Sequence, residues 1–165
     1  MKIVQTIINS LEDTPLLLNN LLVEIPEDMY RIKRLPGKWC IQEQVCHLVE
    51  AQKILIERFK IFEKEENPII KDYIPTRTND PDKYFKMDMD ESLKRFPVIR
   101  EDMVNMLRKH PSSFWKKKGK HDSFEPYSTR ILLMHCLNID YAHLFSIEQL
   151  GLTKPGLETE IMVLP

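Results

Sequence analysis

The sequence predicts an all-α fold, a four-helix bundle with a long crossover loop between the second and third helices. Only four of the 165 residues are glycine. Apolar residues recur at steps of three and four over long stretches, which is the period of an amphipathic helix. No segment alternates apolar and polar residues convincingly, as a half-buried strand does. Because a long connection can cross one end of a bundle, the second and third helices need not be antiparallel neighbours.

The first helix is predicted within residues 1–25. Its apolar positions follow the helical period: Ile3, Ile7, Leu11, Leu16, Leu18, Leu21 and Leu22. Pro15 removes an interior backbone donor, so we expect a kink or a fresh start near residues 12–14. Pro26 then ends the element.

The second helix has the clearest pattern. It follows the turn signal Leu35-Pro36-Gly37 and runs from Ile41 to Glu65 without proline or glycine. About 25 residues correspond to roughly 37 Å of helix. One apolar stripe follows its length: Val45, Leu48, Val49, Ile54, Leu55, Phe59 and Phe62.

Residues 66–88 form the predicted crossover loop, because this stretch contains three prolines and several Asn and Asp residues. Loops of this length in a compact domain tend to be functional or mobile. The third helix is predicted to begin with Asp88 or Asp90 as its N-cap and to end at the His110-Pro111 boundary, with Pro97 bending it or marking its first turns.

The segment from Trp115 to His121 is predicted to be an exposed turn, since it carries four lysines. The last helix is predicted to start at Ser128 and to stop at Gly151. The bundle domain therefore spans residues 1–151, and residues 152–165 form a C-terminal tail. Its apolar stretch Ile161–Leu164 is expected to pack on a neighbouring element or a second subunit.

Composition excludes several classes of protein. With 24 basic and 25 acidic residues the net charge is −1, so no global field attracts nucleic acid. No apolar run reaches the ~20 residues of a membrane span, and the N-terminus lacks the pattern of a signal peptide. Three cysteines cannot all pair, and their spacing matches no zinc motif. We expect a cytoplasmic protein without structural disulfides.

His47 and His143 are the candidate metal ligands. His47 lies at the border of the apolar stripe of the second helix, and His143 follows Ile139 at helical spacing on the last helix. Histidines from two facing helices are a common way to build a metal site inside a bundle. A histidine at the edge of the core with one hydrogen bond is the more frequent interpretation of either residue alone.

Two carboxylates could complete such a site. Asp140 precedes His143 by three residues, and Glu50 follows His47 by three, so each shares a helix face with a histidine. Solvated carboxylates on a helix face are more frequent than ligands. His135 is excluded from the same ion, because eight helical residues separate it from His143 by roughly 12 Å.

Three segments resemble the DinB/YfiT-like superfamily. The stretch LPGKWCIQEQVCHLVEAQKILIERF (residues 35–59) is similar to the family's second-helix signature, and ENPIIKDYIP (residues 66–75) to the loop after that helix in the branch that resembles bacillithiol-dependent S-transferases. The last helix, with Asp140, His143 and Gln149, is similar to the family's final metal helix.

The resemblance implies a bundle, often dimeric, that binds zinc or nickel through three histidines. One ligand falls on His47 and the last on His143, whereas the middle position is Ile139. A two-histidine site binds metal more weakly, unless Asp140 or Glu50 replaces the missing ligand; otherwise the site is vestigial and the metal is lost.

Two functions follow from the resemblance. One is a metal-dependent S-transferase or hydrolase, acting on a small molecule with water or a low-molecular-weight thiol. The other is a degenerate bundle without catalysis, a dimeric binding or stress-related protein, which Ile139 favours. Either would be a homodimer, without nucleic-acid or membrane partners.

Overall fold

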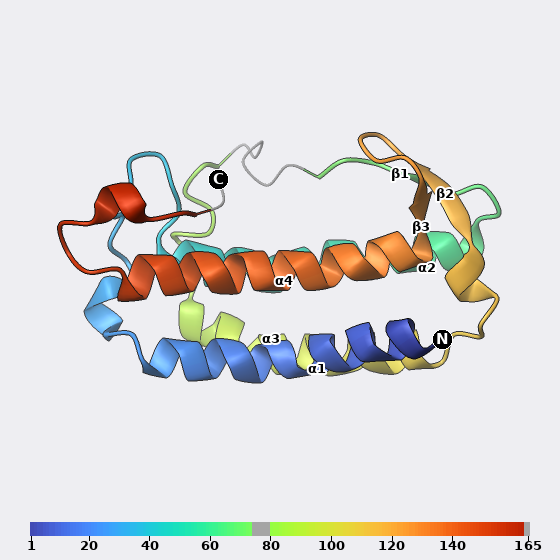
Figure 1. The fold of residues 1–165 in the computed structure, drawn as a ribbon, viewed down its shortest axis with the longest axis horizontal. Helices are drawn as coiled ribbons and strands as arrows, with labels where there is room; N and C mark the ends of the chain where they lie inside the picture. Colours follow the sequence, from blue (N-terminus) through green and yellow to red (C-terminus); the bar gives the residue numbers. More distant parts are fainter. Residues whose placement is uncertain (74–79, 164–165) are drawn as a thin grey trace.

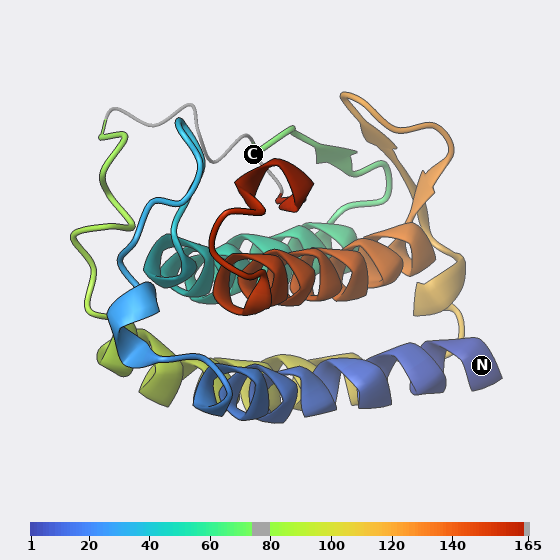
Figure 2. The same cartoon turned by 60° about the vertical axis from the view of Figure 1, so that its left-hand side comes forward.

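The computed structural model describes residues 1–73 and 80–163, and it consists mainly of four long helices. They are α1 (Lys2–Val23), α2 (Ile41–Lys64), α3 (Met89–Arg108) and α4 (Thr129–Leu152). The predicted four-helix bundle is confirmed. In Figure 2 the pair α2 and α4 forms one layer and the pair α1 and α3 forms the other. Helix α2 also packs against α3, and α4 against α1, so the four helices enclose a common core.

A small sheet at one end of the bundle was not expected from the sequence. Strands β1 (Ile69–Ile70), β2 (Lys118–His121) and β3 (Tyr127–Ser128) lie in the order β1-β2-β3. Strand β1 runs parallel to β2, and β3 runs antiparallel to it (Figure 1). A strand of two to four residues is too short to show an alternating apolar and polar pattern in the sequence. The strands also pair with segments that are distant in the chain, which no local pattern indicates.

The segment 115–121 is therefore not an exposed turn. Trp115 lies in the short helix η2 (Phe114–Lys116) and is 3% exposed, packed into the core. The side chain of His121 is 2% exposed. Lys116, Lys118 and Lys120 are exposed, whereas Lys117 is half-buried and donates to the Phe62 carbonyl, so the lysines do not prevent the flanking rings from being buried.

The expected break at Pro15 is absent, because α1 is continuous from Lys2 to Val23. Proline at this position leaves the carbonyl of Leu11 without its usual helical donor. The hydroxyl of Thr14 lies 2.9 Å from that carbonyl oxygen, within hydrogen-bond distance. The same hydroxyl lies 2.7 Å from the Asp140 carboxylate, so the Leu11 carbonyl and this carboxylate share its single proton.

The boundaries of the last two helices agree closely with prediction. Asp88 caps α3 by accepting a hydrogen bond from the Glu91 amide, and Ser128 caps α4 in the same way from Ile131. Helix α4 passes through Gly151 and ends at Leu152. A Cβ at Gly151 would lie 2.3 Å from a methyl carbon of Ile25, so glycine here permits close packing.

The tail folds back on its own bundle. Ile161 is 8% exposed and packs into a core cluster with Leu18 and Leu22. The Arg34 guanidinium donates to the Thr153 carbonyl and pairs with Glu158 at 3.0 Å. Of the predicted contact strip 161–164, residue 164 lies outside the described part of the chain, as do residues 74–79 of the crossover loop.

Among the described helices, none is both long and apolar enough to cross a membrane.

Candidate functional site

The structure brings His47 of α2 and His143 of α4 together. Their ring centroids lie 4.9 Å apart, and the side chains belong to residues that are 5% and 6% exposed. Helices α2 and α4 are neighbours in one layer, and each histidine points from its helix toward the other. The pairing that the sequence suggested is therefore present as a contact.

Both imidazoles are held in their neutral form. Burial lowers the pKa of His47 to about 3, with smaller contributions from the proximity of His143 and Lys83. Burial lowers the pKa of His143 to about 4. Neutral imidazole is the form that binds a metal ion, because the ring then has a free lone pair.

The tautomer of His143 follows from one hydrogen bond. Its Nδ1 lies 2.6 Å from Oε1 of Gln44, and an amide oxygen can only accept. Nδ1 therefore carries the proton and donates it, which leaves a lone pair on Nε2. A carbonyl-type acceptor on the second ring nitrogen is the usual outer partner of a metal-binding histidine.

His47 has an unsatisfied ring nitrogen. Its Nδ1 is buried and has no hydrogen-bond partner among the residues that the structure describes. Buried polar atoms without a partner are uncommon in folded proteins. This nitrogen is free to bind an ion or a ligand group.

Aromatic side chains surround the histidine pair. The ring of Trp39 lies 4.8 Å from that of His47 and stacks on His143 at 6.4 Å. Tyr84 meets His47 edge-on at 5.0 Å, and Tyr73 stacks parallel to it at 6.3 Å. The two tyrosine hydroxyls lie 3.0 Å apart. These rings account for the burial that keeps the imidazoles neutral.

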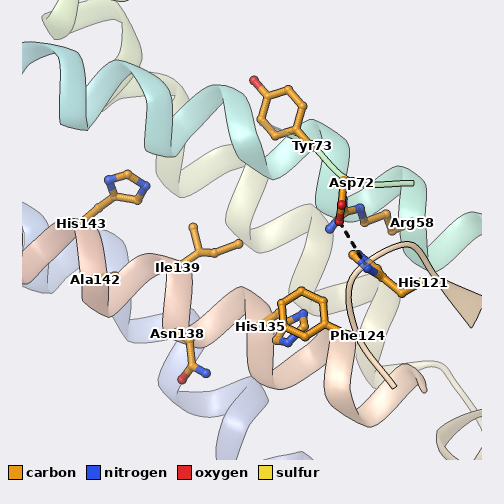
Figure 3. A pocket seen from close by; sticks show the side chains of 10 residues that line it. All are labelled: Arg58, Asp72, Tyr73, His121, Phe124, His135, Asn138, Ile139, Ala142 and His143. Atoms are coloured by element: carbon orange, nitrogen blue, oxygen red, sulfur yellow. Dashed lines mark ion pairs between the residues drawn. The ribbon is translucent and has the colours of Figure 1, made fainter. Parts of the chain in front are cut away.

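A pocket of about 330 Å³ opens beside His143 (Figure 3). One wall comes from a single side of α4: His135, Asn138, Ile139, Ala142 and His143. The opposite wall comes from α2, the segment after β1, and the end of the sheet: Arg58, Asp72, Tyr73, His121 and Phe124. This volume suits a small organic molecule.

Ile139 lies between His143 and the two other histidines of this pocket, His121 and His135. In Figure 3 its side chain projects from α4 on the same side as His143, one turn away along the helix. It also packs against both hydrophobic clusters of the core. The position therefore presents an apolar surface to the pocket and cannot supply a ligand.

Asp140 is engaged in the core. Its carboxylate pairs with the Arg100 guanidinium at 2.6 Å, and it lies 2.7 Å from the Thr14 hydroxyl and 3.4 Å from the Gln52 amide. Burial raises its pKa, and these three partners oppose the rise. With three partners, its oxygens are committed to this network.

Glu50 lies at the edge of the α2 surface. It forms ion pairs with Lys53 at 2.8 Å and with Arg95 of α3 at 3.2 Å. Partial burial is the largest single influence and raises its pKa, but Lys53 and Arg95 together outweigh it, so the pKa is lowered overall. The structure therefore gives both predicted carboxylates partners other than the histidine pair.

The imidazoles of His47 and His143 are suited to supply two ligands to a divalent ion. Both histidines are neutral, their rings are in contact, and one ring nitrogen lacks a partner. A third protein ligand is missing, since no cluster of three or more His, Cys, Asp or Glu side chains suited to a metal occurs within residues 1–73 and 80–163. Catalytic zinc sites normally have three.

Several residues of the site were missed by sequence analysis. Gln44 and Trp39 both precede His47 within the stretch that resembles the family's second-helix signature, but neither was assigned a role at the site. His121 reaches the pocket on β2, which pairs with β1, and His135 lines it from α4. The sequence places His121 in a predicted exposed turn and His135 too far from His143 to share an ion, so neither indicated this pocket.

Fold and site together define a helical-bundle protein with a histidine pair at a small-molecule pocket. The model of the DinB superfamily matches residues 10–145, which is most of the chain, and the chain belongs to this superfamily. The predicted resemblance is confirmed.

A curated relative and a solved structure agree with this assignment. The chain is 25% identical over 114 residues to "Putative metal-dependent hydrolase OB0782" of Oceanobacillus iheyensis, covering 69% of this chain and 66% of the relative. The structure of YfiT from Bacillus subtilis, described as a probable metal-dependent hydrolase with an unusual four-helix bundle topology, superposes with a TM-score of 0.74. That match has 20% identity and covers 89% of this chain and 85% of the other, so it shows the fold alone.

Proposed function

We propose that this protein is a metal-dependent enzyme, a hydrolase or a thiol S-transferase, that acts on a small molecule in the pocket beside His143. The observation that carries this proposal is the contact between two neutral, buried imidazoles, one of which has an unpartnered nitrogen. The relatives' names, which refer to metal-dependent hydrolases, support it.

His47 and His143 would hold the ion, with zinc or nickel as the expected metal. When bound, such an ion lowers the pKa of a coordinated water or thiol, so that it becomes a nucleophile at neutral pH. Gln44 accepts the Nδ1 proton of His143, which would leave Nε2 as the atom that holds the ion. Trp39 and Tyr84 exclude water from the His47 ring.

The chain's own residues also define where the substrate would lie. Ile139, Ala142 and His143 share the side of α4 that lines the pocket. Ile139 gives the middle of the pocket an apolar wall in place of a third ligand. The ion would therefore keep more positions for water, thiol or substrate than a three-histidine site does, and its affinity would be lower.

A non-catalytic binding protein is the second candidate, and Ile139 is the observation that favours it. An apolar side chain in the middle ligand position, packed against both core clusters, would stabilise a metal-free bundle. The same pocket would then bind a small molecule without chemistry at the histidines.

Metal content distinguishes the two candidates. Tag-free protein, purified without chelator and titrated with Zn²⁺ or Ni²⁺, would be compared with His47→Ala and His143→Ala by plasma mass spectrometry. Glu50→Gln is the matched control, since its carboxylate pairs with Lys53 and Arg95. We expect about one ion per wild-type chain at saturation, loss in both histidine variants, and no change in the control.

The opposite result would reject the proposal that this protein is a metal-dependent enzyme. If the wild type takes up no metal, or if both histidine variants retain it, the histidine pair is not a metal centre and the binding protein is preferred. Loss of metal in Glu50→Gln alone would assign Glu50 as a ligand and would contradict the pairing described above.

The proposal includes a homodimer in the cytoplasm. Helix α4 exposes Tyr141 and Phe145 at 44% and 42%, which a second subunit could cover. All three cysteines are buried and free, as is usual in a reducing compartment. Light scattering coupled to size exclusion would give the subunit number, and a monomer at micromolar concentration would reject the dimer.

A further inference from the structure

We propose that the pocket binds an elongated small molecule with an apolar body and one anionic end group, and that the anionic group lies at the end formed by Arg58, His121 and His135. This inference rests on the proposed function only in taking this pocket as the substrate site. It adds the chemical class of the ligand, which neither the histidine pair nor the family defines.

The pocket has two distinct ends. His143 lines one end, beside His47, and His135 lines the other. Both are on α4, and eight residues of helix correspond to about 12 Å. A ligand that reaches both ends is therefore elongated, with a length near that of an eight-carbon chain.

The middle of the pocket is apolar. Ile139 and Ala142 line this part of the pocket from α4, and Figure 3 shows the Tyr73 ring on the other side of it; the Phe124 ring lies further along, 4.6 Å from that of His135. These side chains give a hydrocarbon body favourable contacts but offer few hydrogen bonds, so a uniformly polar ligand such as a sugar would lose hydration without replacement.

The distal end is rich in hydrogen-bond donors. Arg58 contributes a guanidinium, which is anchored by a 2.7 Å bond to the Lys71 carbonyl. His121 accepts a hydrogen bond from the Ser123 amide on Nδ1, so its neutral ring carries its proton on Nε2 as a donor. His135 contributes a second imidazole at this end. Guanidinium and imidazole groups are common partners of carboxylates and phosphates.

One carboxylate, that of Asp72, also lines this end, and one of its oxygens already accepts a hydrogen bond. Asp72 accepts a hydrogen bond from the Ser123 hydroxyl, and its other oxygen lies 3.4 Å from Nδ1 of His121, which has no proton to donate while it accepts from the Ser123 amide. It is 37% exposed, at the rim. A cationic ligand would have to compete for Asp72 and approach Arg58, whereas an anion meets Arg58 and two imidazoles that can donate.

Carboxylate and phosphate ends share this chemistry, so the test includes both. Calorimetric titration of metal-free protein would compare octanoate, octyl phosphate, octanol and octylamine. We expect at least one anion to bind about tenfold more tightly than octanol, and octylamine to bind no better than octanol. The tighter anion identifies the end group.

Variants locate the anion. Arg58→Gln should weaken binding of that anion about tenfold while leaving octanol unchanged. Arg95→Gln is the matched control, because this arginine pairs with Glu50 outside the pocket. Since Arg58 also anchors Lys71, His135→Gln on the rigid helix α4 serves as a second variant, and each protein's thermal unfolding would be checked.

The proposal is overturned if octanol binds as tightly as both anions, or if Arg58→Gln and His135→Gln both match the control. These outcomes are independent of metal. Metal uptake without anion preference would reject this ligand class and keep the proposed function, and anion binding without metal uptake would do the reverse.

Discussion

Two buried polar clusters lie three residues apart on α4, and they differ in which atoms lack a partner among the described residues: guanidinium Nε and Nη1 of Arg100 in one, and a ring nitrogen of His47 in the other. Asp140 has a salt bridge with Arg100 and hydrogen-bond partners on α1 and α2, Thr14 and Gln52. His143 has one partner, Gln44, and contacts a second histidine whose Nδ1 has none among the described residues. Burial is the leading cause of the pKa shifts in both clusters.

The difference separates a structural cluster from a functional one. A network that links all four helices of the core and uses its acceptors internally holds the bundle together. A histidine pair with one unpartnered ring nitrogen, next to a pocket, retains the capacity to bind. Perturbed pKa values alone would not have distinguished the two, because burial produces both.

Removing Arg100 should have the largest effect on stability. Arg100→Met leaves the Asp140 carboxylate buried without its cation, and we expect the free energy of unfolding to fall by about 3–5 kcal/mol in urea denaturation. Metal uptake by the histidine pair should persist under conditions where the variant is folded.

The double variant Arg100→Met/Asp140→Leu serves as the control for this prediction. Removing both charges should recover much of the lost stability, because no unpaired charge stays buried. If the double variant is as unstable as Arg100→Met, or if the single variant is fully stable, the network is not the structural cluster described here.

Ile139→His should convert the pair into a three-ligand site. Its side chain already lines the pocket on the same side of α4 as His143. We expect Zn²⁺ affinity to increase on the order of 100-fold in a competition assay with a chromogenic chelator, since the third imidazole is held at i,i+4 spacing. Ile139→Gln controls for the loss of the isoleucine, and equal affinities in the two variants would contradict the prediction.

Acid should destabilise the metal-free protein partly through His47. Its pKa is about 3 when folded and 6.5 in the unfolded chain, so between these values the unfolded state binds more protons and stability falls as pH falls. Going from pH 7 to pH 5, wild type should lose about 2 kcal/mol more than His47→Phe in urea denaturation with EDTA present. Equal losses would show that His47 is not held neutral by burial.

Gln44→Leu should have the smallest effect. Without the amide oxygen, the Nδ1 proton of His143 loses its acceptor and the orientation of the ring is no longer fixed. Outer partners of this kind contribute about tenfold to metal affinity. The same competition assay would measure it, with Gln52→Leu as the comparison, because Gln52 belongs to the Asp140 network. An affinity loss confined to Gln52→Leu would reverse the assigned roles.

The sequence was informative where a pattern is local. The helical period, the caps Asp88 and Ser128, and the uninterrupted α2 are properties of neighbouring residues, and the structure agrees with them. The failures are also instructive. Helix α1 continues through Pro15, and the Thr14 hydroxyl lies beside the Leu11 carbonyl that has lost its helical donor. Trp115 is buried because it packs into the core with segments that are distant in the chain.

The sequence by itself determined a four-helix bundle of the DinB superfamily and the two histidines worth testing, because periodicity and motif spacing are carried by short stretches of chain. The tertiary structure decided which polar neighbours are available. It paired Asp140 with Arg100 and Glu50 with Arg95, and it brought His121 and His135 to the pocket of His143. The ion pairs Asp140–Arg100 and Glu50–Arg95 join residues 40 or more positions apart in the chain. Such contacts exist only once the helices and the small sheet have packed.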